Sequence, residues 1–268
     1  MLNITSELSI PDVLKSLDED GFAVIANVIS PDDAAEIAEL TLRCPTRSPG
    51  VQGWEAYLTL LNFDLRFASL TACPPVLEIV RQLLGGRTEA QANAFAWPAE
   101  DQIRLCNMDG LVAHPGSDPG VWHNDPPMGQ LNPDKPLPEF PFTVNVMWIL
   151  TPFSRETGGT RVLPGSHRLR RIPEPTADDL DGQVTVTASA GSVAIIPNTC
   201  WHAAGANQSS HQRVAVNCNY APWWLGRITP DIYPVSPEVY QTLPPQVQAL
   251  TKHQLNWNTD FRGQLTEE

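Results

Sequence analysis

The sequence predicts a mainly β-sheet domain with flanking helices, and three observations lead to that prediction. Short β-rich apolar segments dominate from about residue 91 onward. The 26 prolines are about twice the usual share of roughly 5%, which implies many turns and few long helices. Helix signals are concentrated before about residue 90. Such a sheet system, a sandwich or a barrel, can bury its outer apolar side beneath helices packed on one face.

The first clear helix begins after Ser30. Ser30 is a good N-cap, and Pro31 occupies the first helical position, where its missing N–H costs nothing. Asp32 and Asp33 place negative charge at the positive end of the helix dipole. We therefore expect a helix that runs to about Arg43.

Three other segments have helical patterns. Residues 11–20 end at Gly21, and residues 74–84 are followed by Gly85 and Gly86, whose lack of a Cβ suits a left-handed cap. A weaker helical pattern returns in the tail, over residues 237–255.

The predicted strands are short and separated by turns rich in Gly, Pro and Asn. They are residues 91–98, 102–114, 142–150, 183–189, 191–197 and 213–222. No linker or repeat interrupts them, so we expect a single domain over residues 1–268. Within it we expect a helix-rich part over about 1–90, a β core over about 91–225 and a C-terminal extension over about 226–268.

Composition narrows the possible partners and the cellular location. The formal charge of −13 argues against a nucleic-acid surface, because phosphate binding needs clustered Lys and Arg. The one dense basic run, Arg168, Arg170 and Arg171, is interpreted as a solvated face. Five cysteines without a C-x-x-C pair favour neither disulfides nor a zinc ribbon, so a reducing cytoplasm is expected.

No membrane partner is expected either. The amino terminus lacks the pattern of a secretory signal, and no apolar run approaches the roughly 20 residues that a membrane-spanning helix needs. We expect a cytoplasmic protein, a monomer or homodimer, that acts on a small molecule.

Two histidines and an aspartate form the candidate metal site. His123 and Asp125, in W-H-N-D, lie two apart at the end of an extended segment, where both side chains point the same way. His202 follows the predicted strand 191–197. Two imidazoles and one carboxylate can form a facial triad with open coordination positions, which suits Fe(II) that activates dioxygen, and zinc fits less well.

Arg213 is the candidate anchor for a carboxylate near this metal. It starts the strand over residues 213–222, and its planar guanidinium can grip a carboxylate in bidentate fashion. An arginine at a strand edge is more often a solvated residue, and an H-x-D tripeptide occurs often by chance. The H-x-D tripeptide, His202 and Arg213 taken together predict a metal site with a carboxylate anchor.

The chain resembles the phytanoyl-CoA dioxygenase family over most of its length. The resemblance rests on the segments DGFAVIANVISPDD, W-H-N-D, G-G-T-R-V-L-P-G-S-H-R and W-H-A-A-G-A-N followed by R-V-A-V-N. It implies a double-stranded β-helix, a cupin-like jelly roll, whose open mouth holds Fe(II) and 2-oxoglutarate. By the same resemblance His123, Asp125 and His202 match the metal ligands, and Arg213 matches the anchor of the distal carboxylate of 2-oxoglutarate.

Further residues have weaker assignments. Thr160, in the signature turn, could donate its hydroxyl to 2-oxoglutarate, and Asn107 could reach the co-substrate or the substrate. For each, a plain structural role is the competing interpretation. The resemblance places His167 in a structural turn, not at the metal. The proline-rich segment 128–142 is either a lid over the iron or a rigid surface loop.

The implied activity is oxidation of a small organic metabolite, most simply hydroxylation, with Fe(II), 2-oxoglutarate and dioxygen. Related halogenases replace the carboxylate ligand by a small residue, so the intact Asp125 favours hydroxylation. The same triad also serves desaturation, epoxidation and ring rearrangement, and an acyl-CoA hydroxylase is a further alternative. From another class, a jelly roll that binds a metal or ligand without catalysis stays open.

Overall fold

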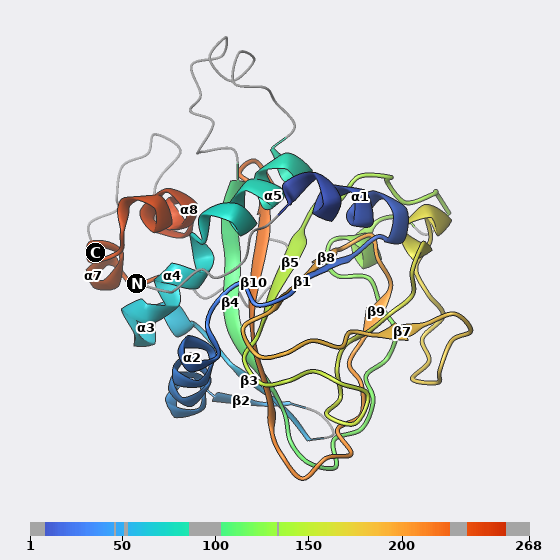
Figure 1. Ribbon diagram of the computed structural model, residues 1–268. Coiled ribbons are helices and arrows are strands. Elements are labelled where there is room, and N and C mark those ends of the chain that lie inside the picture. The colour runs from blue at the N-terminus through green and yellow to red at the C-terminus, as the bar shows by residue number, and fades with distance from the viewer. Residues whose placement is uncertain are drawn as a thin grey trace.

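Two antiparallel sheets form the centre of the protein (Figure 1). The computed structural model describes residues 9–45, 47–50, 53–85, 103–132, 134–225 and 235–255, so the predicted strand 91–98 and the far C-terminal tail lie outside the described residues. The described strands are β1 (Ala23–Ile25), β2 (Arg47–Pro49), β3 (Trp54–Tyr57), β4 (Ile103–Ala113), β5 (Val144–Ile149), β6 (Arg161–Val162), β7 (Val184–Thr185), β8 (Val193–Pro197), β9 (His202–Ala203) and β10 (Arg213–Pro222).

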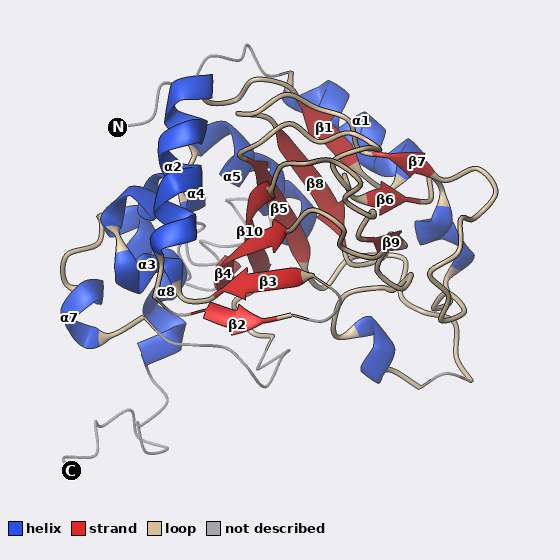
Figure 2. Ribbon diagram, turned by 90° about the horizontal axis from the view of Figure 1, so that it is seen from below, coloured by secondary structure: helices blue, strands red, loops and turns tan. Residues whose placement is uncertain are grey.

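The major sheet has the order β1-β8-β5-β10-β4-β3-β2, and the minor sheet has the order β7-β6-β9. Strands from the helix-rich N-terminal part, β1, β2 and β3, occupy both edges of the major sheet. The minor sheet lies against one face of the major sheet (Figure 2). This arrangement is the predicted jelly roll.

Helices cover the opposite face of the major sheet, away from the minor sheet (Figure 1). They are α1 (Ile10–Asp20), α2 (Pro31–Arg43), α3 (Leu60–Phe63), α4 (Ala68–Thr71), α5 (Pro74–Leu84), α7 (Pro237–Tyr240) and α8 (Pro245–Leu255). The helices contribute residues such as Ile37, Ile79 and Leu250 to one buried cluster with Val146 and Val216 of the sheet. None of the helices in the described part of the chain is long and apolar enough to cross a membrane.

Most predicted element boundaries are confirmed. Helix α2 begins after Ser30, whose side chain accepts a hydrogen bond from the backbone N–H of Asp33. Helix α1 ends at Gly21 in the left-handed conformation (φ 84°). The left-handed cap predicted at Gly85 or Gly86 is wrong for Gly85, and Gly86 lies outside the described residues. Gly85 keeps right-handed dihedrals (φ −68°) and its N–H bonds to the carbonyl of Arg81, so helical geometry continues one residue past α5.

Strand β10 lies between β4 and β5 and positions the site. Its residues alternate between faces, so that Val214 and Val216 pack under the helices while Ala215 packs between the two sheets. Arg213 shares the inner face with Ala215 by the same period. Asn217 follows on that face, where its side chain contacts Asn145 of β5.

Two glycines, Gly158 and Gly205, allow the signature turn to pack against the loop that follows β9. A Cβ on Gly205 would overlap the carbonyl oxygen of Gly159, and a Cβ on Gly158 would lie 2.7 Å from the carbonyl oxygen of Gly205. Gly158 also has φ 78°, which favours glycine. Close backbone approach therefore accounts for glycine in this part of the motif, which directly precedes Thr160.

We expect Gly205→Ala to destabilise the protein by about 1–3 kcal/mol or more, because the added methyl group meets backbone that cannot rotate away. Gly129→Ala is the matched control, since a Cβ there meets nothing within 4 Å and φ is not positive. It should be neutral or slightly stabilising. Thermal unfolding of both variants measures the difference, and equal melting temperatures would contradict the packing argument.

Candidate metal centre

A pair of backbone hydrogen bonds brings the two histidines together. His123 and His202 form an isolated antiparallel bridge, with N–H to carbonyl distances of 3.0 Å and 3.1 Å in the two directions. Asp125 lies two residues beyond His123 on the same extended segment, so its side chain returns to the same side. The ligand atoms of the three residues all lie within 4.8 Å of one another. The structure thus assembles the predicted triad from segments far apart in the sequence.

Hydrogen bonds engage Nδ1 of both imidazoles and leave Nε2 of each available to bind a metal. His123 Nδ1 lies 2.8 Å from the carbonyl oxygen of Val121, and His202 Nδ1 lies 3.1 Å from that of Cys200. A carbonyl can only accept, so each Nδ1 must carry the proton and each neutral Nε2 is left with a lone pair. Both Nε2 atoms face Asp125, at 3.7 Å for His123 and 3.3 Å for His202.

The charges of the triad also suit a cation. Burial alone would raise the pKa of Asp125, but His202, His123 and a hydrogen bond from Asn145 lower it to about 2. Burial and the neighbouring His202 lower the pKa of His123. Burial also acts to lower the pKa of His202, but the adjacent carboxylate outweighs it and raises the pKa. Near neutral pH the site therefore offers an ionised carboxylate and a neutral His123, and a metal would take the place of any proton on His202.

Arg213 is a buried cation without a carboxylate partner among the described residues. Its side chain is only 2% exposed, and its Nε and Nη1 atoms have no hydrogen-bond partner in that part of the chain. The guanidinium lies between the rings of Trp54 and Phe153, at 4.5 Å and 4.6 Å from their centroids. This loss of solvent lowers the pKa of Arg213 to about 9. Two unused donors in a dry aromatic slot fit the carboxylate of a ligand.

Thr160 and Asn107 both lie on the interior side of the sheets. The hydroxyl of the buried Thr160 points to the thioether of Met147 on β5, at 3.5 Å, and sulfur is a weak acceptor that a better one can replace. Asn107 stands opposite Asn219 in the β4–β10 register, and its amide donates to Asp109 at 2.6 Å. Their roles toward 2-oxoglutarate or substrate stay predictions.

The remaining basic and histidine residues serve the fold. His167 Nε2 lies 3.1 Å from the carbonyl oxygen of Asp18, away from the triad. Arg170 donates from Nε to the carbonyl of Leu137 and accepts from the backbone N–H of Leu137, each at 2.8 Å. The basic run is therefore not simply solvated, because one of its members fastens the segment 128–142. Whether that segment moves stays a prediction.

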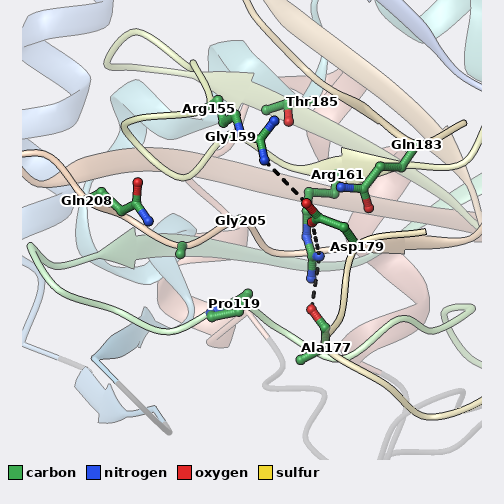
Figure 3. Close-up of a pocket in the computed structure, with 11 residues that line it drawn as sticks. Pro119, Arg155, Gly159, Arg161, Ala177, Asp179, Gln183, Thr185, Gly205 and Gln208 are labelled. Atoms are coloured by element: carbon green, nitrogen blue, oxygen red, sulfur yellow. Dashed lines mark hydrogen bonds and ion pairs between the residues drawn. The ribbon is translucent and has the colours of Figure 1, made fainter. Parts of the chain in front are cut away.

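A second buried arginine, Arg161, differs from Arg213 because protein groups accept all of its hydrogen bonds. Arg161 of β6 lines a cavity of about 180 Å³, shown with Asp179 and Ala177 in Figure 3. Its donors meet the carbonyl oxygens of Gly120, Ala177, Asp178 and Ala204 and the carboxylate of Asp179. The cavity adjoins the face of the minor sheet opposite the triad, because Val162 and Arg161 point to opposite sides. Arg161 is satisfied by the protein, whereas Arg213 is not.

Sequence reasoning missed three residues that complete the site. Trp54 and Phe153 form the slot for Arg213, and neither carries a local signal of that role. Asn145 donates a hydrogen bond to Asp125. Its signal is present in the sequence, as one amide inside the apolar run that became β5.

We expect His202→Ala to weaken binding of a divalent metal by more than about 100-fold, because one of three ligands is lost and even supporting residues change affinity by 10–100-fold. Titration calorimetry with Ni(II) measures the affinity. His167→Ala is the matched control, since it removes an imidazole outside the triad. Equal affinities in the two variants would show that the triad is not the metal site.

Comparisons with known proteins agree with this geometry. The family model for phytanoyl-CoA dioxygenase (PhyH) matches residues 17–215. The uncharacterized protein Rv1501 of Mycobacterium tuberculosis is 28% identical over 229 residues, 81% of this chain and 77% of that protein. The iron/alpha-ketoglutarate-dependent dioxygenase okaE of Penicillium ochrochloron is 24% identical over 218 residues, 78% of this chain and 70% of its own.

The fold has solved counterparts as well. HygX from Streptomyces hygroscopicus, crystallised with nickel and 2-oxoglutarate, superimposes with a TM-score of 0.65 at 18% identity, over 85% of this chain and 95% of HygX. A second HygX structure also contains hygromycin B. Because the family model covers well over half of its length, this chain belongs to the phytanoyl-CoA dioxygenase family.

Proposed function

We propose that the protein is an Fe(II)- and 2-oxoglutarate-dependent dioxygenase that oxidises a small organic metabolite, most simply by hydroxylation. The observation that carries the proposal is the combination of a metal-binding triad with a buried, unpaired Arg213 on the interior face of β10. A protein that only bound a metal would gain nothing from desolvating a guanidinium without a partner.

The residues present fit both groups. His123 and His202 would bind Fe(II) through Nε2, and Asp125 would bind it through its carboxylate, the donor set that Fe(II) takes in oxygenases of this type. A site with only three protein ligands would leave room at the metal for the co-substrate. When bound, these groups supply the oxidising power, with 2-oxoglutarate converted to succinate and carbon dioxide as one oxygen atom enters the substrate.

Arg213 would hold the distal carboxylate of 2-oxoglutarate. Arg213 is only 2% exposed in the slot between Trp54 and Phe153, so a bidentate ion pair there is stronger than one at the surface. The two rings also fix the plane of the guanidinium, which sets the direction of the bound ligand. Thr160, beside Met147 of β5, would add a hydroxyl donor, and Asn107 of β4 would add an amide.

The carboxylate ligand bears on the outcome of the reaction. Asp125 is present at the position where related halogenases carry a small residue that admits a halide, so hydroxylation is the simplest outcome. Desaturation, epoxidation and ring rearrangement use the same triad and stay alternatives. Nothing in the site distinguishes an acyl-CoA from a free metabolite.

The substrate class and location rest on coarser support. The structure of HygX with hygromycin B bound favours a small-molecule substrate, in line with a natural-product intermediate. All five cysteines are buried, and no C-x-x-C pair occurs among them, in keeping with a reducing cytoplasm as the place of action.

We expect Arg213→Gln to raise the dissociation constant for 2-oxoglutarate by about 100-fold or more, because removing one partner of a buried charge pair costs about 2–5 kcal/mol. The measurement is titration of 2-oxoglutarate into the Ni(II) protein. Metal affinity without 2-oxoglutarate should stay within a few-fold of wild type.

Arg161→Gln is the matched control for this variant. It removes a buried arginine whose donors all have protein partners, so it should lower stability and leave the affinity of the folded protein for 2-oxoglutarate unchanged. An unchanged affinity in Arg213→Gln would remove the observation on which the proposed function rests.

A further inference from the structure

Three asparagines interrupt the interior faces of the two most central strands near the triad. Asn145 lies on β5, and Asn217 and Asn219 lie on β10. Asparagine is disfavoured in strands, and a buried amide costs free energy unless it is hydrogen-bonded. Neighbouring interior positions are apolar, for example Met147 and Ala215. Local exceptions of this kind in a well-patterned sheet are expected where function requires them.

Hydrogen bonds link the three side chains to one another, and Asn145 links them to Asp125. The amide of Asn145 donates to Oδ2 of Asp125, and the Asn145 carbonyl accepts from Asn217 at 3.0 Å and from Asn219 at 2.6 Å. Asn145 and Asn219 are 6% and 8% exposed, so water supplies little to either of them. We call these three residues the asparagine bracket.

The direction of every hydrogen bond in the bracket follows from Asp125. An ionised carboxylate can only accept, so Asn145 must present its NH₂ to Asp125 and its oxygen to β10. That oxygen can only accept, so Asn217 and Asn219 must both present their NH₂ groups. Only one set of orientations of the three amide groups therefore satisfies these hydrogen bonds, and in it each NH₂ group donates in the direction of the carboxylate.

We propose that Asn145 is a positioning residue for the metal centre, which holds the Asp125 carboxylate in place and is itself held by Asn217 and Asn219. The inference rests on the proposed function, in which Asp125 is a metal ligand. The amide donates to Oδ2 and resists rotation of the carboxylate. Among the described residues, the side chain of Asn145 hydrogen-bonds to Asp125, Asn217 and Asn219 and to neither histidine of the triad. Its effect on the metal would therefore pass through Asp125.

The test is a double-mutant cycle with Ni(II) as the probe, read by calorimetry without 2-oxoglutarate. Asn145→Leu keeps the approximate size of the side chain and removes both of its hydrogen-bonding groups. We expect it to weaken Ni(II) binding about 10–100-fold when Asp125 is present, as is usual for partners of metal ligands. In an Asp125→Ala background, where the two histidines still bind Ni(II), the same substitution should change the affinity less than about 2-fold.

A matched control separates positioning from general stability. Asn207→Ala removes another buried amide, which bonds the carbonyls of Ala113 and His211 away from the triad. It should lower the melting temperature and leave Ni(II) affinity unchanged. Asn145→Ala, which leaves a small void in place of a bulky group, is measured beside Asn145→Leu in case one variant does not fold.

The outcomes are distinct. Equal losses of affinity in the two Asp125 backgrounds, or no loss in either, would overturn the positioning role of Asn145 and leave the proposed function standing. Failure of the wild-type protein to bind Ni(II) would overturn both.

Discussion

A positive charge buried without a protein anion is the constraint around which this site is organised. Folding removes the guanidinium of Arg213 from water and surrounds it with Trp54 and Phe153, and no carboxylate in the described residues offsets that cost. A ligand carboxylate recovers the lost interaction on binding. The fold of the apo protein thus already includes the desolvation cost of Arg213. Recovery of that cost by the carboxylate of the co-substrate contributes to the affinity for the co-substrate.

The metal centre depends on backbone geometry to the same degree. The bridge between His123 and His202 joins the extended segment after β4 to the start of β9, so the two imidazoles face one point before any metal binds. Carbonyl oxygens fix both Nδ1 protons, and Asn145 fixes the carboxylate. Preorganisation of this kind limits the rearrangement that metal binding requires.

The sequence predicted those parts of the site whose signals are local. Strand β10 has the predicted bounds, α2 starts at its predicted cap, and the period of two placed His123 and Asp125 on one side of the chain. His202 and Arg213 were singled out because each lies beside a predicted strand, and the family resemblance then matched them to a metal ligand and a carboxylate anchor. Local pattern thus predicted the strands, and the resemblance supported the roles of the ligands.

The rest could not be predicted because it arises from packing between distant segments. Trp54 comes from β3, which the N-terminal part contributes next to β4, and no sequence period relates it to Arg213. Asn145 was visible as an amide in an apolar run, but its neighbours on β10 follow only from strand order. At Gly85 the lack of a Cβ permits a left-handed cap without requiring one. Gly85 instead keeps right-handed dihedrals directly after the end of α5.

The most direct test of the account is anaerobic addition of Fe(II) and then 2-oxoglutarate to the apo protein, followed by visible absorption spectroscopy. The account predicts a weak charge-transfer band that appears only when both are present, because the triad and Arg213 hold metal and co-substrate at one site. Absence of the band at saturating concentrations of both would contradict the proposed dioxygenase and favour a jelly roll that binds another metal or ligand.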